Sequence, residues 1–261
     1  MPSGPIVVAV FLALAAVGIV YYIIAARKRR EALRAVAVSR GLAFYSRDPY
    51  NLPVRYEAMK LCGQGHGRAA SNVIAGPVGD GEVNYFDYSY TVGSGKDSHT
   101  YSLSACAFRV PCMFKRLLVR PENLFDKAAA LIGFEDIDLD LDEFNRKFYV
   151  SSEDKKFAYD VLNQRAMEFL LDLPGITMEM GWNYCLFNYR RVLKPDEVNE
   201  LISAASQFYD LLPDFLKADG RLVPPGERKA TGSSGQSASG GVRFSSGIAP
   251  TVRRDRKESA P

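Results

Sequence analysis

The chain has 261 residues, of which 47% are hydrophobic, and its net charge is +3. This length allows one domain of ordinary size with a hydrophobic core and shorter flanking segments. The charge is unevenly divided, because residues 27–40 and 221–261 each carry +5, which leaves −7 on residues 41–220. An acidic domain binds nucleic acid poorly, since neutralising phosphates dominates that affinity. The composition therefore argues against a nucleic-acid partner.

Residues 6–26 form an apolar stretch of 21 residues without a charge. As a helix this stretch is about 31 Å long, which matches the hydrocarbon layer of a bilayer. A cleaved signal peptide would be shorter and would begin with basic residues, but residues 1–5 contain no Lys or Arg. The sequence predicts a transmembrane helix over residues 6–26, preceded by a short extracytoplasmic N-terminus at residues 1–5.

Four basic residues, Arg27, Lys28, Arg29 and Arg30, follow the apolar stretch directly. Lys and Arg beside a span stay on the cytoplasmic side, so the charge bias predicts a cell-membrane protein with its N-terminus outside and its soluble part in the cytoplasm. We expect these four side chains at the membrane surface. They stop the span, and contact with anionic lipid head groups is a second interpretation of the same residues.

A basic juxtamembrane helix is predicted over residues 27–40. Leu33, Val36 and Ala37 share one face of it, and Gly41 suits its C-terminal end.

Residues 69–120 alternate with a period of two and predict a meander of about four antiparallel strands. One of these strands covers residues 82–92 and places Phe86, Tyr88, Tyr90 and Val92 on a single face. Two further strands are expected at residues 100–110 and 114–121.

Helices dominate the second half of the pattern. One helix is predicted from Pro121 onward. A second is predicted over residues 155–173, with Ser151 and Asp154 as a capping box. A third is predicted from Pro195 to Leu212, where apolar residues recur at helical spacing. Strands are interposed at residues 144–150 and in a hairpin over residues 176–192 that turns at residues 181–183. The predicted fold class for residues 41–220 is α+β, an antiparallel sheet with packed helices. Residues 221–261 are rich in Gly, Ser, Arg and Pro, and predict a disordered basic tail.

The acidic run EDIDLDLDEF at residues 135–144 suggests a calcium loop. An EF-hand needs Gly at position 6 and Glu at position 12. A loop that starts at Asp136 has Leu141 and Lys147 there instead. We expect an extended segment with Ile137, Leu139 and Leu141 facing the core and the acids facing water, and we assign no metal ligands and no cofactor site.

The glycine-rich loops offer little chemistry. GSGK at residues 93–96 fails the Walker pattern, because Tyr90 stands where its first glycine belongs and Asp97 follows the lysine. The two histidines, His66 and His99, lie in loops without a nucleophile elbow or zinc motif. We assign no catalytic residue.

The four cysteines, Cys62, Cys106, Cys112 and Cys185, show no CxxC spacing. We interpret them as buried or neutral thiols in a reducing compartment.

Two motifs resemble those of an uncharacterised actinobacterial family of single-pass membrane proteins. They are the tyrosine-rich hairpin FDYSYTVGSGK at residues 86–96 and the FNRxF strand-helix motif that begins at Phe144. The resemblance runs from Gly41 to Leu216. It implies a single anchor and a soluble domain, and it brings no known activity.

These observations favour a membrane-tethered cytoplasmic binding or scaffold module. Its expected partners are the bilayer, through residues 6–26, and a protein. One alternative is a membrane-bound enzyme of hydrolase type that uses loop residues near 62–67 and 93–99. Another is a lipid-sensing domain that uses the basic flanks. A deep cleft that places a histidine beside Cys, Ser or a carboxylate would favour the enzyme.

Overall fold

The computed structural model describes residues 4–122 and 135–219. Helices and strands follow in this order along the chain: α1 (Gly4–Ser39), β1 (Ala43–Arg47), α2 (Leu52–Arg55), α3 (Lys60–Gly63), β2 (His66–Val78), β3 (Gly81–Val92), a 3-10 turn (Gly95–Asp97), β4 (His99–Pro121), β5 (Glu135–Asp136), α4 (Asp142–Lys147), β6 (Phe148–Ser152), α5 (Lys155–Val161), α6 (Gln164–Leu171), β7 (Ile176–Tyr189), α7 (Pro195–Leu211) and α8 (Asp214–Asp219).

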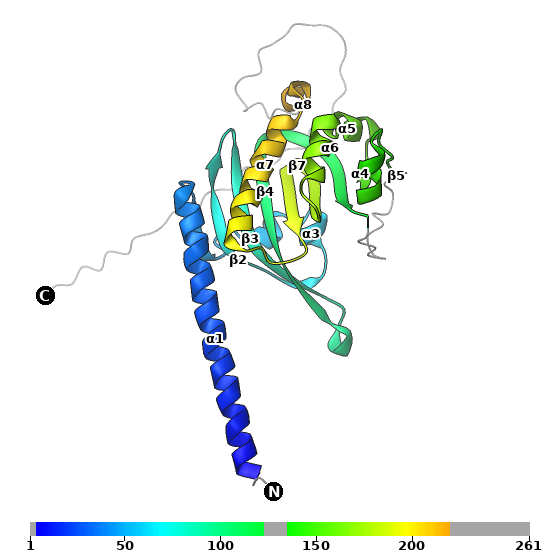
Figure 1. Ribbon diagram of the computed structural model, residues 1–261. Coiled ribbons are helices and arrows are strands. Elements are labelled where there is room, and N and C mark those ends of the chain that lie inside the picture. The colour runs from blue at the N-terminus through cyan, green and yellow to red at the C-terminus, as the bar shows by residue number, and fades with distance from the viewer. Residues whose placement is uncertain (1–3, 123–134, 220–261) are drawn as a thin grey trace, which may run out of the picture. The chain divides into compact units, whose positions relative to one another are not determined.

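Every strand pairing in the sheet is antiparallel. Strands β1, β2, β3 and β4 follow one another as a meander, and β4 is the central strand. One edge of β4 pairs first with β3 and then with β6, whereas its other edge pairs with β7. The α+β class with an antiparallel sheet and packed helices is confirmed (Figure 1).

The two faces of the sheet carry separate hydrophobic clusters. The larger cluster joins the sheet to α1, α7 and the helices α4 to α6, with Tyr85 and Phe108 among its strand residues. The smaller cluster lies on the opposite face beneath α2 and α3. It holds Phe86, Tyr88 and Tyr90 of the predicted row, whereas Val92 at the end of that row is exposed. Because the short helices α2 and α3 cover only part of this second face, space remains beside them for a pocket.

Helix α1 is continuous from the apolar stretch into the domain core. It is the one helix in the described residues that is long and apolar enough to cross a membrane. The side chains of residues 7–25 are exposed, but Leu33 and Ala37 are fully buried. This C-terminal part packs against α7, β1 and β2. The predicted juxtamembrane helix is therefore part of the folded domain.

Two predicted breaks in the sheet are absent, because β4 and β7 pair on both sides of one irregularity. The residues expected to form two strands at 100–110 and 114–121 belong to the single strand β4, whose register with β7 shifts between Arg109 and Leu117. The predicted hairpin over residues 176–192 is wrong. Strand β7 continues from Ile176 to Tyr189, and Trp182, with a φ of 53°, pairs with Phe114 where the turn was expected. The extra residues of the bulge belong to β4.

The predicted helix over residues 155–173 is interrupted. Asp154 caps α5 through a hydrogen bond from the Phe157 N–H (2.9 Å), and Asn163 caps a new helix, α6, through the Ala166 N–H (3.2 Å). The strand expected at residues 144–150 begins only at Phe148.

Pro121 ends β4 and does not start a helix at that position. The rest of the helix expected after it lies outside the described residues, as does the predicted disordered tail beyond residue 221.

Candidate functional site

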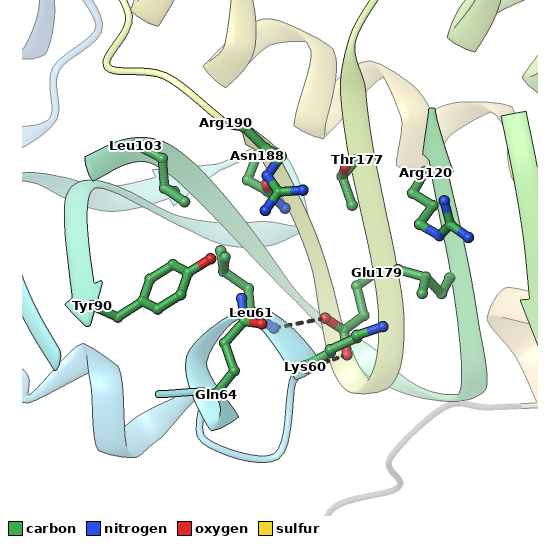
Figure 2. Close-up of a pocket in the computed structure, with 11 residues that line it drawn as sticks. Lys60, Leu61, Gln64, Tyr90, Leu103, Arg120, Thr177, Glu179, Asn188 and Arg190 are labelled. Carbon is green, nitrogen blue, oxygen red and sulfur yellow. Dashed lines mark hydrogen bonds between the residues drawn. The ribbon is translucent and has the colours of Figure 1, made fainter. Parts of the chain in front are cut away.

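A pocket of about 70 Å³ opens on the sheet face that α3 covers in part. Its walls come from α3, β3, β4 and β7 (Figure 2). Leu103 and Leu118 supply apolar surface, while Gln64, Tyr90 and Thr177 supply amide and hydroxyl groups. The lining is therefore mixed, with a polar part that is suited to recognising a hydrophilic group.

A buried carboxylate forms one side of this pocket. Glu179 of β7 is 6% exposed. Its Oε1 accepts a hydrogen bond from the backbone N–H of Lys60 (2.5 Å), and its Oε2 accepts a longer one from Leu61 (3.4 Å). Burial raises the pKa of the Glu179 carboxyl, although these two N–H groups oppose the rise. Glu179 thus fixes the start of α3 against the sheet.

Three basic side chains, Lys60, Arg120 and Arg190, also line the pocket. The guanidinium of Arg120 lies 4.2 Å from the ring centre of Tyr149, and that of Arg190 lies 5.8 Å from the ring centre of Tyr101. Such stacking holds each guanidinium in place. With Glu179 ionised, the lining carries a net charge of about +2, so it attracts anions.

Asn188 of β7 adds an amide to the pocket. The residue is 4% exposed and belongs to the lining. Its side chain can both donate and accept a hydrogen bond. Figure 2 shows Asn188 beside Arg190, so that an amide and a guanidinium are available to one ligand.

The sequence did not reveal this site. Its residues come from positions 60 to 190, which meet only because β4 is flanked by both β3 and β7. The one local signal was the charged Glu179 inside an otherwise apolar strand pattern.

The four predicted membrane-surface residues separate into two groups. Arg27, Lys28 and Arg30 are exposed, whereas Arg29 turns into the domain. Its Nη2 donates to Oδ1 of Asp87 (2.9 Å), its Nε donates to Oδ2 (3.2 Å), and its Nη1 donates to the carbonyl oxygen of Leu193 (2.5 Å). Arg29 is therefore a structural residue in this fold.

Asp87 is the centre of a polar network between α1 and the sheet. Its carboxylate also accepts hydrogen bonds from Tyr85 (2.6 Å), Ser104 (2.9 Å) and Asn72 (2.9 Å). The alternation of β3 places Asp87 on the face opposite Phe86, toward α1. A lone acid in an aromatic strand was the signal that could have predicted this contact.

The loops proposed for an enzyme do not assemble a nucleophile and a base. Nε2 of His66 lies 2.9 Å from the carbonyl oxygen of Gly93, and both His66 and His99 are exposed. Burial raises the pKa of the Cys62 thiol to about 12, so the thiol stays protonated at neutral pH. Neither histidine lines the pocket described above.

All four cysteines are buried thiols that form no disulfide, as predicted. The acidic run also has the predicted alternation. Ile137 and Leu139 are buried, whereas Asp138 and Asp140 are exposed. Leu141 is half-buried against the larger hydrophobic cluster.

The comparisons give a fold relationship. The chain matches no protein-family model and no curated protein sequence. Among solved structures it is similar to the mycobacterial trehalose monomycolate transport factor A, TtfA, with a TM-score of 0.56 and 16% identity. The match covers 72% of this chain and 97% of the TtfA chain. At this identity the likeness shows a shared fold, and the neighbour is an actinobacterial protein, as the sequence resemblance led us to expect.

Proposed function

We propose that this chain is a membrane-anchored accessory module that binds an anionic group, a phosphate or a carboxylate, in the pocket beside α3. The observation that carries the proposal is the pocket itself. It combines two stacked guanidinium groups with the buried amide of Asn188. Arginine forks match the oxygens of carboxylates and phosphates, and an amide adds a directed donor.

The module acts by binding. The described loops supply no paired nucleophile and base, and the buried Glu179 is occupied in holding α3. An accessory role also agrees with the fold relationship, because TtfA is described as a transport factor.

The anchor is residues 6–26 of α1, and the domain lies on the cytoplasmic side. The basic residues after the span support this orientation, and four buried cysteines without a disulfide are compatible with a reducing compartment. A protein partner in the membrane would then carry the anionic group, or would receive it from the pocket.

The pocket is tested by titrating the full chain in detergent micelles with inorganic phosphate and with glycerol phosphate, followed by ligand-observed NMR. We expect Arg190→Ala and Arg120→Ala each to weaken binding by about 10- to 100-fold, the effect of losing a charged hydrogen bond of about 1.5–3 kcal/mol. Arg165→Ala is the matched control, because Arg165 is an exposed arginine on α6 outside the pocket.

Two results would contradict the proposal. One is the absence of saturable binding of either probe. The other is an equal loss in the Arg165→Ala control, which would show that the probes respond to net charge and not to the pocket.

A further inference from the structure

Strand β3 runs alongside α1 in the opposite direction. Near the start of β3, Val83 pairs with Gly76, and Gly76 lies against Leu42, which follows the C-terminal end of α1. Four residues later, Asp87 binds Arg29, which is more than two turns nearer the N-terminus of α1. Beyond Asp87, β3 therefore continues toward the apolar half of α1.

The rest of β3 is longer than the distance to the predicted membrane boundary. Ala26 ends the apolar stretch three residues before Arg29, about 4.5 Å along the helix at 1.5 Å per residue. Gly93 lies six residues after Asp87, about 20 Å along the strand, so even a strand steeply inclined to the helix covers the distance of about 4.5 Å. Figure 1 shows the teal β3–β4 hairpin projecting toward the N-terminal side of α1. The hairpin tip thus reaches the level of Ala26, where the head-group layer borders the hydrocarbon.

We propose that the tip of the β3–β4 hairpin, residues 92–101, lies in the lipid head-group layer on the side of the bilayer that carries the domain. This inference rests on α1 crossing the membrane, which is part of the proposed function.

The chemistry of the hairpin tip suits the head-group layer. Val92 and Tyr101 are 44% and 40% exposed on its flanks, and tyrosine rings are favoured at membrane interfaces. Lys96 at the tip adds a positive charge that an anionic leaflet attracts. The tip also carries the polar side chains of Ser94, Asp97 and Ser98. They keep it out of the hydrocarbon layer, because burying polar groups there is costly.

The arrangement of α1 and the hairpin gives the domain two contacts with the membrane. The buried Arg29–Asp87 pair fixes the angle between them. The domain would then be held against the bilayer in one orientation.

Depth-dependent fluorescence quenching tests the proposal on the full chain in phosphatidylcholine and phosphatidylglycerol vesicles. A thiol-reactive fluorophore is attached at the tip in Ser94→Cys. Two control variants carry the same fluorophore. In Asp80→Cys it is attached at an exposed turn position at the opposite end of β3. In Gly18→Cys it is attached within the span, where the added side chain meets open space. The four native cysteines are buried and leave the introduced thiol to react.

We expect head-group nitroxide lipids to quench the label at position 94, and we expect aqueous iodide to lose access to it. The label at position 80 should show the reverse pattern, and the label at position 18 should be quenched by acyl-chain nitroxides. If the position 18 label is quenched as expected but the position 94 label behaves like the position 80 label, the hairpin proposal is overturned while the anchor stands. If the position 18 label escapes acyl-chain quenching, the anchor is wrong and the hairpin proposal falls with it.

Discussion

Asp87 joins the predicted anchor to the sheet, and its surroundings explain why an ion pair persists there. Its side chain is 11% exposed and that of Arg29 is 23% exposed. A buried pair is stable only when further hydrogen bonds satisfy the remaining polar atoms, and Tyr85, Ser104 and Asn72 supply them. Removal of one partner would leave the rest of the network around an uncompensated charge.

Arg29→Ala is therefore expected to lower the free energy of unfolding by about 3 kcal/mol, since loss of one member of a buried pair costs several kcal/mol and Arg29 keeps some contact with water. Urea unfolding of the full chain in micelles, followed by Trp182 fluorescence, measures it. Arg30→Ala is the matched control, because Arg30 is the exposed neighbour, and it should change stability by less than about 0.5 kcal/mol. Equal effects of the two substitutions would show that charge near the span matters and that the pair does not.

Glu179 makes stability depend on pH in a predictable direction. Burial raises its folded-state pKa above the unfolded value, so its contribution is full below the unfolded pKa and is lost as pH rises through the folded pKa. Glu179→Gln removes this titration while keeping an acceptor for the Lys60 N–H. We expect the variant to gain stability relative to the wild type as pH rises from about 4 to 8. Urea midpoints across this pH range measure the effect, and a constant difference would refute it.

At the scale of single residues, the sequence predicted which face of a strand a side chain occupies better than it predicted which side chains contact each other. The row of Phe86, Tyr88 and Tyr90, and the buried Ile137 and Leu139, follow directly from two-residue alternation. The partners Arg29 and Asp87 are 58 residues apart, and no local pattern determines which basic residue of four turns inward. The pocket was missed for the same reason.

At the scale of secondary-structure elements, the errors fall where tertiary pairing overrides a local turn signal. Gly181 to Asn183 resembles a turn, but β7 pairs with the long strand β4 on both sides of this segment, and a bulge in β4 opposite Trp182 costs less than giving up that pairing. Likewise, Asn163 ends one helix and caps another within a segment whose apolar stripe appeared continuous. Helix α7 was predicted well because its apolar stripe and its proline start agree, and in the structure Glu197 also accepts a hydrogen bond from the Lys194 N–H.

Phe208 tests the packing of α7 on the sheet. It is fully buried, and its ring lies 5.5 Å from that of Phe187 on β7. Phe208→Ala is expected to lower the free energy of unfolding by about 3–5 kcal/mol, from lost burial and the cavity left behind. Gln207→Ala, on the exposed side of the same helix, should cost less than about 0.5 kcal/mol. A loss below about 1 kcal/mol for Phe208→Ala, measured by urea unfolding, would mean that the core refills the space.

At the scale of the whole molecule, α1 serves both as the predicted anchor and as part of the domain core. Its first part is apolar and exposed, and its last part carries Leu33 and Ala37 into the larger hydrophobic cluster. A flexible linker between a span and a domain would let the domain rotate freely. Here a continuous helix and the Arg29–Asp87 pair remove that freedom, so the orientation of the anchor also determines the orientation of the pocket.

The orientation of the chain is therefore the prediction with the widest consequence. Six Lys and Arg residues lie within residues 27–40 and none within residues 1–5, and basic residues beside a span resist translocation. We expect a C-terminal green fluorescent protein fusion to be fluorescent and a C-terminal alkaline phosphatase fusion to be inactive. An active phosphatase fusion with a dark fluorescent fusion would place the domain outside.

A charge-inverted variant separates the basic residues from other causes of orientation. It carries Pro2→Lys and Ser3→Lys together with Arg27→Gln, Lys28→Gln and Arg30→Gln. Arg29 is kept, because its loss would destabilise the domain as well as change the charge near the span. If the three exposed residues set the topology, this variant should shift toward phosphatase activity while its stability stays close to that of the wild type. If the membrane topology of this variant does not change, the folding of the domain itself keeps the C-terminus on the cytoplasmic side, and the basic cluster does not determine the topology.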